Sequence, residues 1–402
     1  MDLAFYTNFS ATLAQGEAQL GRIQQEVASG VAVQTPDQGA AAYQTATAAN
    51  DRVSALSTDS TNQATISAQL GATNNVYSSV SSLFNNVQAV VEQALNATTN
   101  SQNMNTLASQ VTSVAQQLLG LANSKGTSGA YLFGGTAGSL TPFQVNASGN
   151  IAYYGEGGSS YAQVGEGQVA PTVGSGEVFM SGTQGDGFSS VIANAANSGT
   201  GQVLQQGVVN LAQASAFQSG AASVVVTFGA NGSYVETQGG TTLGSGTVTK
   251  NAAGAGTIQI SGMSFDVTGS PAAGDNFTIS PSRPQTAFAL FKQIAGALQG
   301  AANTPAQVAQ TNQVLNQSLA TLSQYQQVIT TAQAQNGIAL NAISNIAAGN
   351  TSQSTALQTS VSNATAVNSP VAISQLDQTL TSLQAAMKAF GTVQNLSLFN
   401  YL

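Results

Sequence analysis

The chain contains no cysteine, no histidine and no tryptophan among its 402 residues. The first two absences exclude disulfides, thiol nucleophiles, imidazole bases and the usual zinc ligands. We therefore expect no metal and no cofactor. Carboxylate chemistry is not excluded, and Glu156, Glu166 and Glu177 recur at intervals of ten and eleven residues. No aromatic-lined cleft accompanies them, so we interpret them as solvated side chains near turns and expect no enzymatic activity.

Charge is almost as scarce, because charged residues make up 5% of the chain against about 25% in a typical soluble domain. The seven basic side chains are scattered singly and the net charge is −8. Nucleic acids and anionic membranes both require clustered Lys and Arg, so neither is an expected partner. A neutral surface of Ser, Thr, Asn and Gln favours self-association, because little charge is desolvated when two copies meet.

Long apolar runs are also missing, so we expect no membrane insertion. The N-terminus lacks the features of a cleavable signal peptide, since its first basic residue is Arg22 and no continuous apolar stretch follows. The protein is therefore expected to stay in the cytoplasm or to be exported by a route that reads another signal.

Glycine is unevenly distributed, and residues 134–283 hold 29 of the 42 glycines. This middle stretch alternates like strands and turns, whereas the flanks have a helical period. We predict an α+β fold in which both chain ends form a long antiparallel helical bundle or coiled coil. The predicted segments are an N-terminal helical segment over 1–139, an inserted β-rich outer domain over 140–283, and a C-terminal segment over 284–402 that completes the helical domain.

Local patterns in the middle stretch predict individual elements. A hairpin is expected around the turn at 229–232, between Val224–Phe228 and Tyr234–Glu236. A helix is expected within residues 191–216, around Val203–Leu211. Further strands are expected at Thr257–Ile260, Met263–Thr268 and Asn276–Ser280.

Both chain ends carry apolar residues at heptad spacing. In the C-terminal row the intervals are 3, 4, 3, 4, 3, which is typical of a helix packed along another helix, with Ser369 as N-cap and Pro370 at its first position. We predict that these rows pair with each other within one copy and also form an interface between copies. The predicted interface residues are Leu13, Leu20, Ile23, Val27, Ile373, Leu376, Leu380, Leu383, Met387, Phe390, Leu396 and Leu398.

The alternative for any such row is the core of an intramolecular bundle. We favour that alternative for Leu107–Leu121 and for Val308–Ile329, because they lie away from the chain ends.

The terminal helices are expected to be marginal on their own. Complete burial of the six apolar side chains from Ile373 to Phe390 contributes roughly 10–20 kcal/mol. Ordering each helical residue costs about 1–2 kcal/mol in backbone entropy, which hydrogen bonds offset only in part. We therefore expect the termini to be poorly ordered in the monomer and to fold on assembly.

Glycine-containing parts of the middle stretch could be ligand sites, but local backbone structure is the favoured interpretation of each. Asp275 and Gly185–Gly187 could belong to calcium sites, but isolated Asp and Asn residues beside glycine more often form turns. Gly134–Gly138 could hold a phosphate, yet it lacks the P-loop spacing and its Lys-Ser/Thr pair, so a helix C-cap and loop is favoured.

The N-terminal half resembles flagellar axial proteins in two places. Ala28–Gly30, followed by Thr35–Ala42, resembles the family's Ser-Gly and Pro-Ser-Asp-Asp turn between helices. Tyr131–Gly135, followed by Thr141–Phe143, is similar to the LFGG and PF stretch that ends the N-terminal helical region. Departures from the family pattern are Gln38 for the second Asp, Val31 for a basic residue and Asp2 for Arg.

The C-terminal half adds two further resemblances. Gly269–Ile279 reads GSPAAGDNFTI, similar to a segment common in hook-associated proteins. Val393–Leu402 ends in NLSLFNYL, similar to the terminus of hook–filament junction proteins. The chain therefore resembles the FlgL family of the flagellin-like superfamily.

This resemblance implies a structural subunit that joins the flagellar hook to the filament. It implies self-assembly through terminal helices into a ring-like layer, with flagellin and the hook-side hook-associated protein as neighbours and an export chaperone as a further partner. It also implies an extracellular location, reached through the flagellar type III channel without a cleaved signal. Flagellin itself is the alternative, since it shares the architecture; a secreted β-rich adhesin or polysaccharide-active enzyme is a third possibility.

Overall fold

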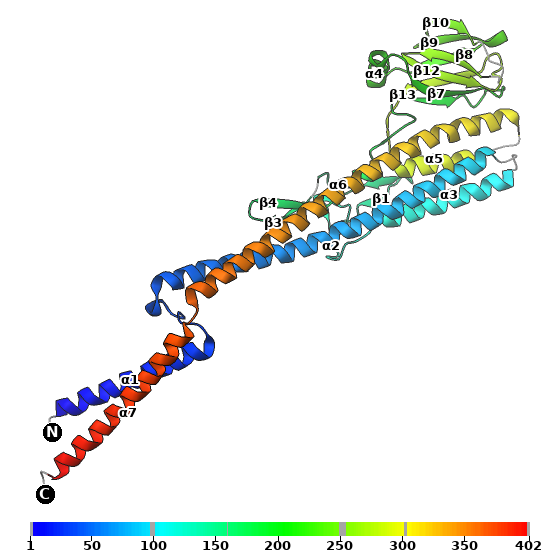
Figure 1. Ribbon diagram of the computed structural model, residues 1–402. Helices are drawn as coiled ribbons and strands as arrows, with labels where there is room; N and C mark the ends of the chain where they lie inside the picture. Colours follow the sequence, from blue (N-terminus) through cyan, green and yellow to red (C-terminus); the bar gives the residue numbers. More distant parts are fainter. Residues whose placement is uncertain (1–2, 97–100, 159, 249–254, 301–303, 400–402) are drawn as a thin grey trace. The chain divides into compact units, whose positions relative to one another are not determined.

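The computed structural model describes residues 3–96, 101–158, 160–248, 255–300 and 304–399, without the side chains of residues 3–5, 173 and 393–399. Along the sequence, long helices precede and follow an inserted antiparallel β-rich domain (Figure 1). This order of elements confirms the predicted fold class. The chain divides into two compact units. The terminal unit comprises Met1–Gln63, Val164–Glu166 and Ser344–Leu402, and the central unit comprises Ala64–Gln163 and Gly167–Ile343.

Two very long helices contribute residues to both units. The boundaries between the two compact units therefore fall inside α2 (Ala40–Asn96) and α6 (Pro305–Thr365). The segments predicted from the sequence are instead separated by their type of secondary structure. The helices are α1 (Leu3–Ser29), α2 (Ala40–Asn96), α3 (Ser101–Ala122), α4 (Leu211–Ser219), α5 (Ala287–Gln299), α6 (Pro305–Thr365) and α7 (Ser369–Phe399).

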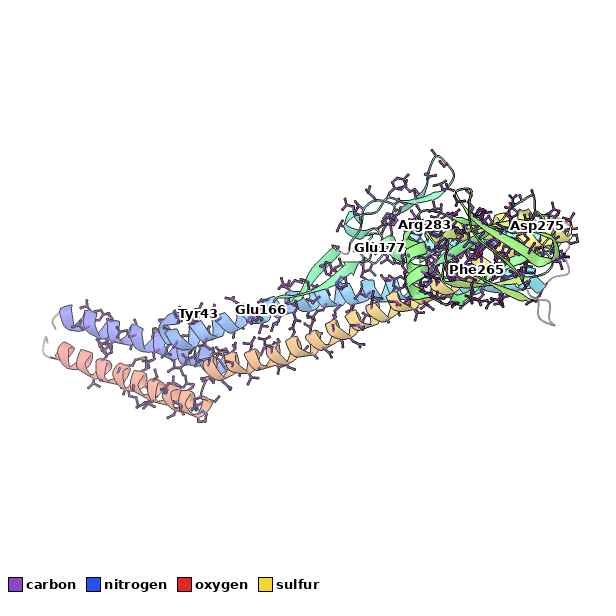
Figure 2. All side chains as sticks on the ribbon, turned by 90° about the horizontal axis from the view of Figure 1, so that it is seen from above. Tyr43, Glu166, Glu177, Phe265, Asp275 and Arg283 are labelled. Atoms are coloured by element: carbon purple, nitrogen blue, oxygen red, sulfur yellow. The ribbon has the colours of Figure 1, made fainter. Side chains whose placement is uncertain are left out.

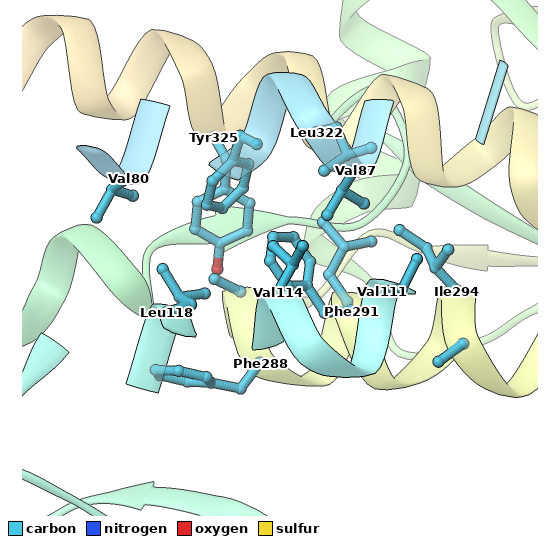
Figure 3. Close-up of a cluster of buried hydrophobic side chains, with 14 of the residues drawn as sticks. Val80, Val87, Val111, Val114, Leu118, Phe288, Phe291, Ile294, Leu322 and Tyr325 are labelled. Carbon is cyan, nitrogen blue, oxygen red and sulfur yellow. The ribbon is translucent and has the colours of Figure 1, made fainter. Parts of the chain in front are cut away.

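The helical core of the central unit is built from α2, α3, α5 and α6. Leu322 and Tyr325 of α6 meet Phe291 of α5 in a continuous apolar cluster, which Figure 3 shows together with valines of α2 and α3. Most residues of the predicted intramolecular cores are buried, and Leu121, Val308 and Leu319 are half-buried. The buried members are Leu107, Val111, Val114, Leu118, Leu315, Leu322 and Ile329.

The β domain is a pair of antiparallel sheets with a core of its own. One sheet has the strand order β10-β9-β8-β13-β6 and the other β11-β12-β7. Val226, Phe265 and Phe277 lie in an apolar cluster that is separate from the helical core. The strands are β6 (Ser189–Ala193), β7 (Gln202–Val208), β8 (Val224–Phe228), β9 (Ser233–Gln238), β10 (Thr241–Thr247), β11 (Gly256–Ile260), β12 (Met263–Thr268) and β13 (Asn276–Pro281).

Short strands form three additional antiparallel pairs outside these sheets. They are β1 (Phe143–Val145) with β2 (Ile151–Tyr153), β3 (Ser160–Gly165) with β4 (Gln168–Val173), and β5 (Gly182–Thr183) with β14 (Pro284–Gln285). The last pair brackets the β domain in the sequence, so we call β5 and β14 the neck.

The predicted hairpin and strands are confirmed; the helix predicted within residues 191–216 is present, but its position around Val203–Leu211 is wrong. The hairpin is β8–β9, and the three further strands are β11, β12 and β13. Val203 instead lies in β7, which pairs with β12, because tertiary strand pairing overrides a weak local helical period. The helix starts later as α4, where the Asn210 side chain accepts a hydrogen bond from the Gln213 N–H.

The start of α7 also differs by one residue from the prediction. The Oδ1 of Asn368 accepts a hydrogen bond from the Val371 N–H at 3.4 Å, so Asn368 occupies the capping position assigned to Ser369. Both residues are good N-caps, and the local sequence does not distinguish them.

Asp275 forms a backbone clamp in the segment that resembles hook-associated proteins. It lies in the β domain with Phe265 (Figure 2) and is 3% exposed. Its Oδ1 accepts from the N–H of Ser198 at 2.8 Å, and its Oδ2 accepts from those of Gly199 at 3.0 Å and Ala272 at 2.8 Å. The carboxylate thus joins two loops through three backbone donors, in agreement with the turn interpretation.

The LFGG segment closes the helical core. Leu132 and Phe133 are buried, and the Phe133 ring meets that of Phe179 edge-on at 5.0 Å. Gly135 has φ of +62°, and a Cβ added there would lie 1.7 Å from the carbonyl oxygen of Glu156. Only glycine fits this close approach between two backbone segments.

Gly135→Ala is therefore expected to destabilise the central unit by at least about 2 kcal/mol, because strain at positive φ adds to a backbone clash. Thermal unfolding of the two purified proteins measures the difference. Gly129→Ala is the matched control, since Gly129 also has positive φ but has no atom within 4 Å of the added Cβ. Equal destabilisation by both substitutions would show that the clash is unimportant.

Candidate assembly surface

The pairing of α1 with α7 is the main feature of the terminal unit (Figure 1). The two helices are antiparallel, since the contacts run from Phe9 with Phe390 near the chain ends to the Val31–Ala366 bridge at the other end of α1. The predicted pairing of the two seams within one copy is thus present.

Aromatic and glycine contacts join the two helices. The rings of Phe9 and Phe390 stack with centroids 4.3 Å apart and an interplanar angle of 7°, and Tyr6 reaches the same Phe390 at 5.9 Å. Nearer the middle of α1, a Cβ added to Gly16 would lie 2.8 Å from the Cδ1 of Leu383. Gly16 therefore lets Leu383 pack directly on the α1 backbone.

The Ser-Gly turn after α1 ties the two chain ends together. Gly30 has φ of +72°, which ends the helix. The Ala32 N–H donates to the Thr365 carbonyl at 2.7 Å, and the Val367 N–H donates to the Gly30 carbonyl at 3.0 Å. These bonds hold the α1–α2 connection against the α6–α7 connection.

Gln38, which departs from the family pattern, retains a capping role. Its Oε1 accepts from the N–H groups of Gln34 at 2.5 Å and Thr35 at 3.1 Å. A hydrogen bond from the Thr35 side chain is the main cause that lowers the pKa of Asp37, which is fully exposed. The side-chain amide oxygen of Gln38 therefore accepts the two backbone N–H groups that this tight turn leaves unpaired.

The predicted interface residues divide into three levels of exposure. Ile23 is buried, whereas Ile373 and Met387 are 48% and 47% exposed. The side chains of Leu396 and Leu398 lie outside the described residues. The half-buried members are Leu13, Leu20, Val27, Leu376, Leu380, Leu383 and Phe390.

The C-terminal row is in fact two parallel rows on α7. One is Leu376, Leu383 and Phe390, whose last two members contact α1 as described above. The other is Ile373, Leu380 and Met387, which lies along the flank of the helix pair because each member is offset by three or four residues from the first row. We call this second row the flank row.

Sequence reasoning missed the small residues that complete the α1–α7 contact. Ala372 is 4% exposed, although it was not predicted. Ala372, Thr379 and Ala386 recur at seven residues, and the last two line the groove between the helices with Gly16. That spacing was the available signal, but a search for large apolar residues passes over Ala, Thr and Gly.

Few charges accompany this surface. The described part of α7 carries Asp377 and Lys388, and α1 carries Glu17, Arg22 and Glu26. The buried Glu26 is paired with Arg22 at 2.6 Å. Asp377 lies on the same face as the flank row, between Ile373 and Leu380, so the flank row offers apolar packing to another helix with one carboxylate beside it.

The three glutamates considered for catalysis have separate surroundings. Glu166 forms an ion pair with Arg52, and Glu156 accepts a hydrogen bond from the Thr136 hydroxyl. Glu177 lines a surface hollow together with Tyr77, whose pKa burial raises to about 12. In the part of the chain that the structure describes, no group of three acidic, His or Cys side chains is arranged to hold a metal.

No described helix has an apolar stretch long enough to cross a bilayer.

Comparison with known proteins places this architecture. The model of the bacterial flagellin N-terminal helical region matches residues 2–138. FlgL from Xanthomonas campestris is 25% identical, with a TM-score of 0.68 over 77% of this chain and 97% of its own. No curated protein matches the chain.

Two structures from Legionella pneumophila share the fold. Its flagellar hook-associated protein-3 has a TM-score of 0.70 at 22% identity, covering 78% of this chain and 97% of that one. Its flagellar junction protein FlgL has a TM-score of 0.68 at 21% identity, covering 80% and 99%. The Legionella structures show the shared fold, and the flagellin-type N-terminal region together with the similarity to Xanthomonas FlgL supports a FlgL-like hook–filament junction protein of the bacterial flagellum.

Proposed function

We propose that this subunit joins hook to filament by self-association through α1 and α7, with the flank row covered by neighbouring copies. The observation that carries the proposal is the incomplete burial, in a single chain, of the apolar rows along α1 and α7. Ile373 and Met387 remain half exposed after α1 and α7 have paired. A second layer of helices would remove both from water.

The energetics favour many weak contacts over one strong one. Burial of the exposed half of Ile373 or Met387 contributes roughly 1 kcal/mol each. Such a contribution does not hold two free subunits together, but a closed layer repeats it at every subunit and fixes the neighbours in place. The scarcity of charge on α1 and α7 keeps the desolvation cost of this packing low.

The proposed partners follow from this role. Copies of the chain form a ring-like layer between flagellin and the hook-side hook-associated protein, with residues 140–283 facing outward. The subunit is structural and not an enzyme. Export occurs without a cleaved signal peptide and involves a chaperone, and the terminal helices gain lasting order on assembly.

Flagellin is the second candidate, because the N-terminal match is to a flagellin region. The two roles differ in abundance and position. Immunogold labelling of purified hook–basal bodies with attached filaments should place this chain at the hook tip alone. Label along the whole filament would identify a filament subunit instead.

Deletion of residues 391–402 should abolish incorporation into the flagellum while leaving the β domain folded. The deletion lies in the terminal unit, whereas the β domain has a separate apolar core. Motility and electron microscopy of the deletion strain measure incorporation, and hydrogen exchange of β8 in the purified protein measures folding. Normal motility would contradict the proposed role of the terminal helices.

A further inference from the structure

A row of polar side chains on α6 faces the β domain. Its members are Gln310, Gln313, Gln317, Thr321 and Gln324, at intervals of 3, 4, 4 and 3. The spacing is that of a helical seam. We call these five residues the amide seam. The amide seam lies beside the apolar row of α6 that enters the helical core, so the same helix carries one polar row and one apolar row.

Two glutamines of the seam bind the edges of both sheets. The Oε1 of Gln313 accepts from the Val203 N–H at 2.8 Å, and its Nε2 donates to the Val203 carbonyl at 2.6 Å. Gln317 makes the equivalent pair with Val191 at 2.7 and 2.6 Å, in the amide orientation that satisfies both groups. Val203 is in β7 and Val191 in β6, which are edge strands of their sheets.

The remaining members bind loops at either end of the seam. The Nε2 of Gln310 donates to the Asn197 carbonyl at 3.2 Å. At the other end the Thr321 hydroxyl accepts from the Gly185 N–H at 2.9 Å, and Gln324 donates to the Gly185 carbonyl at 3.3 Å. Side-chain amides thus replace the neighbouring strand that β6 and β7 lack.

This contact is polar, and the two apolar cores do not merge across it. The helical and β-domain cores are separate clusters. The neck carries the chain into and out of the β domain, and it packs on Tyr325 of α6. The single proton of the Tyr325 hydroxyl is shared between the carbonyls of Phe179 and Gln285, and a Cβ added to Gly182 would lie 2.1 Å from the Tyr325 ring.

We propose that the amide seam is a reversible latch: its hydrogen bonds to the β domain open and close, and the β domain turns about the neck when they are open. Opening breaks side-chain amide hydrogen bonds, which water can replace, and it divides neither of the two separate apolar cores. The β domain therefore undocks from α6 as a folded body, while both cores stay intact. The latch would let the β domain shift as the flagellum bends. That use rests on the proposed function, whereas the existence of the latch does not.

Amide hydrogen exchange of the full-length protein tests the latch directly. The N–H groups of Val191 and Val203 are protected by seam glutamines, whereas Val226 lies in β8, which is paired on both sides. In the wild-type protein we expect Val191 and Val203 to exchange at one common rate, at least about tenfold faster than Val226. Exchange of all three at the same slow rate would overturn the proposal.

Gln313→Met removes two hydrogen bonds at nearly constant volume. We expect exchange at both Val203 and Val191 to accelerate by roughly ten- to hundredfold, with Val226 unchanged. Gln327→Met is the matched control, because Gln327 is exposed on the same helix, and it should change neither rate. Acceleration at Val203 alone would mean independent bonds and no domain movement. If Gln313→Met does not fold, the wild-type rates decide the question.

Discussion

Met387→Asp is expected to reduce incorporation into flagella at least about 100-fold while destabilising the monomer by no more than about 1–2 kcal/mol, from the half of the side chain that is already buried and from the lower helix propensity of Asp. Met387 is 47% exposed in the single chain, so the carboxylate remains solvated there. Next to a neighbouring apolar helix the same carboxylate would be buried without a partner, which costs several kcal/mol. The measurements are subunit content of purified flagella and calorimetric melting of the monomer.

Two further substitutions on α7 make this test specific. Ala385→Asp is the matched control, since Ala385 is exposed and lies two residues away, on nearly the opposite side of the helix. It should leave incorporation close to that of the wild type. The sequence pattern makes Leu383 the natural choice for disruption, but Leu383 packs on Gly16 within one chain. Leu383→Asp should therefore lower both incorporation and monomer stability.

The opposite result for Met387→Asp would place the flank row inside the monomer. Equal loss of melting temperature and incorporation would mean that Met387 stabilises the α1–α7 pair and not a contact between copies. Full incorporation with unchanged melting would mean that the flank row has no role in either.

Asp275→Ala is expected to destabilise the β domain by roughly 3–5 kcal/mol. The substitution leaves the N–H groups of Ser198, Gly199 and Ala272 without the acceptor that they share. Buried unpaired donors cost about 1–3 kcal/mol each, reduced here by any water that enters. Hydrogen exchange at Val226 in β8 reports this domain separately from the helices.

Two controls separate the clamp from a simple loss of charge. Asp275→Asn keeps one acceptor oxygen and should cost less than Asp275→Ala. Asp266→Ala removes a carboxylate from the same domain that accepts one exposed hydrogen bond, from Thr257, and should cost less than about 1 kcal/mol. If calcium stabilised the wild type but not Asp275→Ala, the carboxylate would be a metal ligand and the turn interpretation would be wrong.

Sequence reasoning succeeded where one local pattern met one structural requirement. The strand β11 alternates between buried and exposed residues, β12 and β13 alternate between buried and half-buried ones, and the three are separated by residues suited to turns. The seams of α3 and α6 bury their large apolar residues, as heptad spacing predicts. It failed at β7, where a strand of mixed polarity depends on pairing with β12, and at the amide seam, where the pattern of hydrophobicity contains no signal.

The sequence by itself determined the alternation of helix and strand along the chain, the near absence of charge, and the apolar character of both ends. These properties follow from the repeat of side chains along a single element, which neighbouring residues define. Tertiary structure alone decided which α7 residues face α1, which remain on the flank, and that glutamines of α6 bind the edges of both sheets. Those choices depend on contacts between residues far apart in the chain, and a helix with several usable faces does not specify them locally.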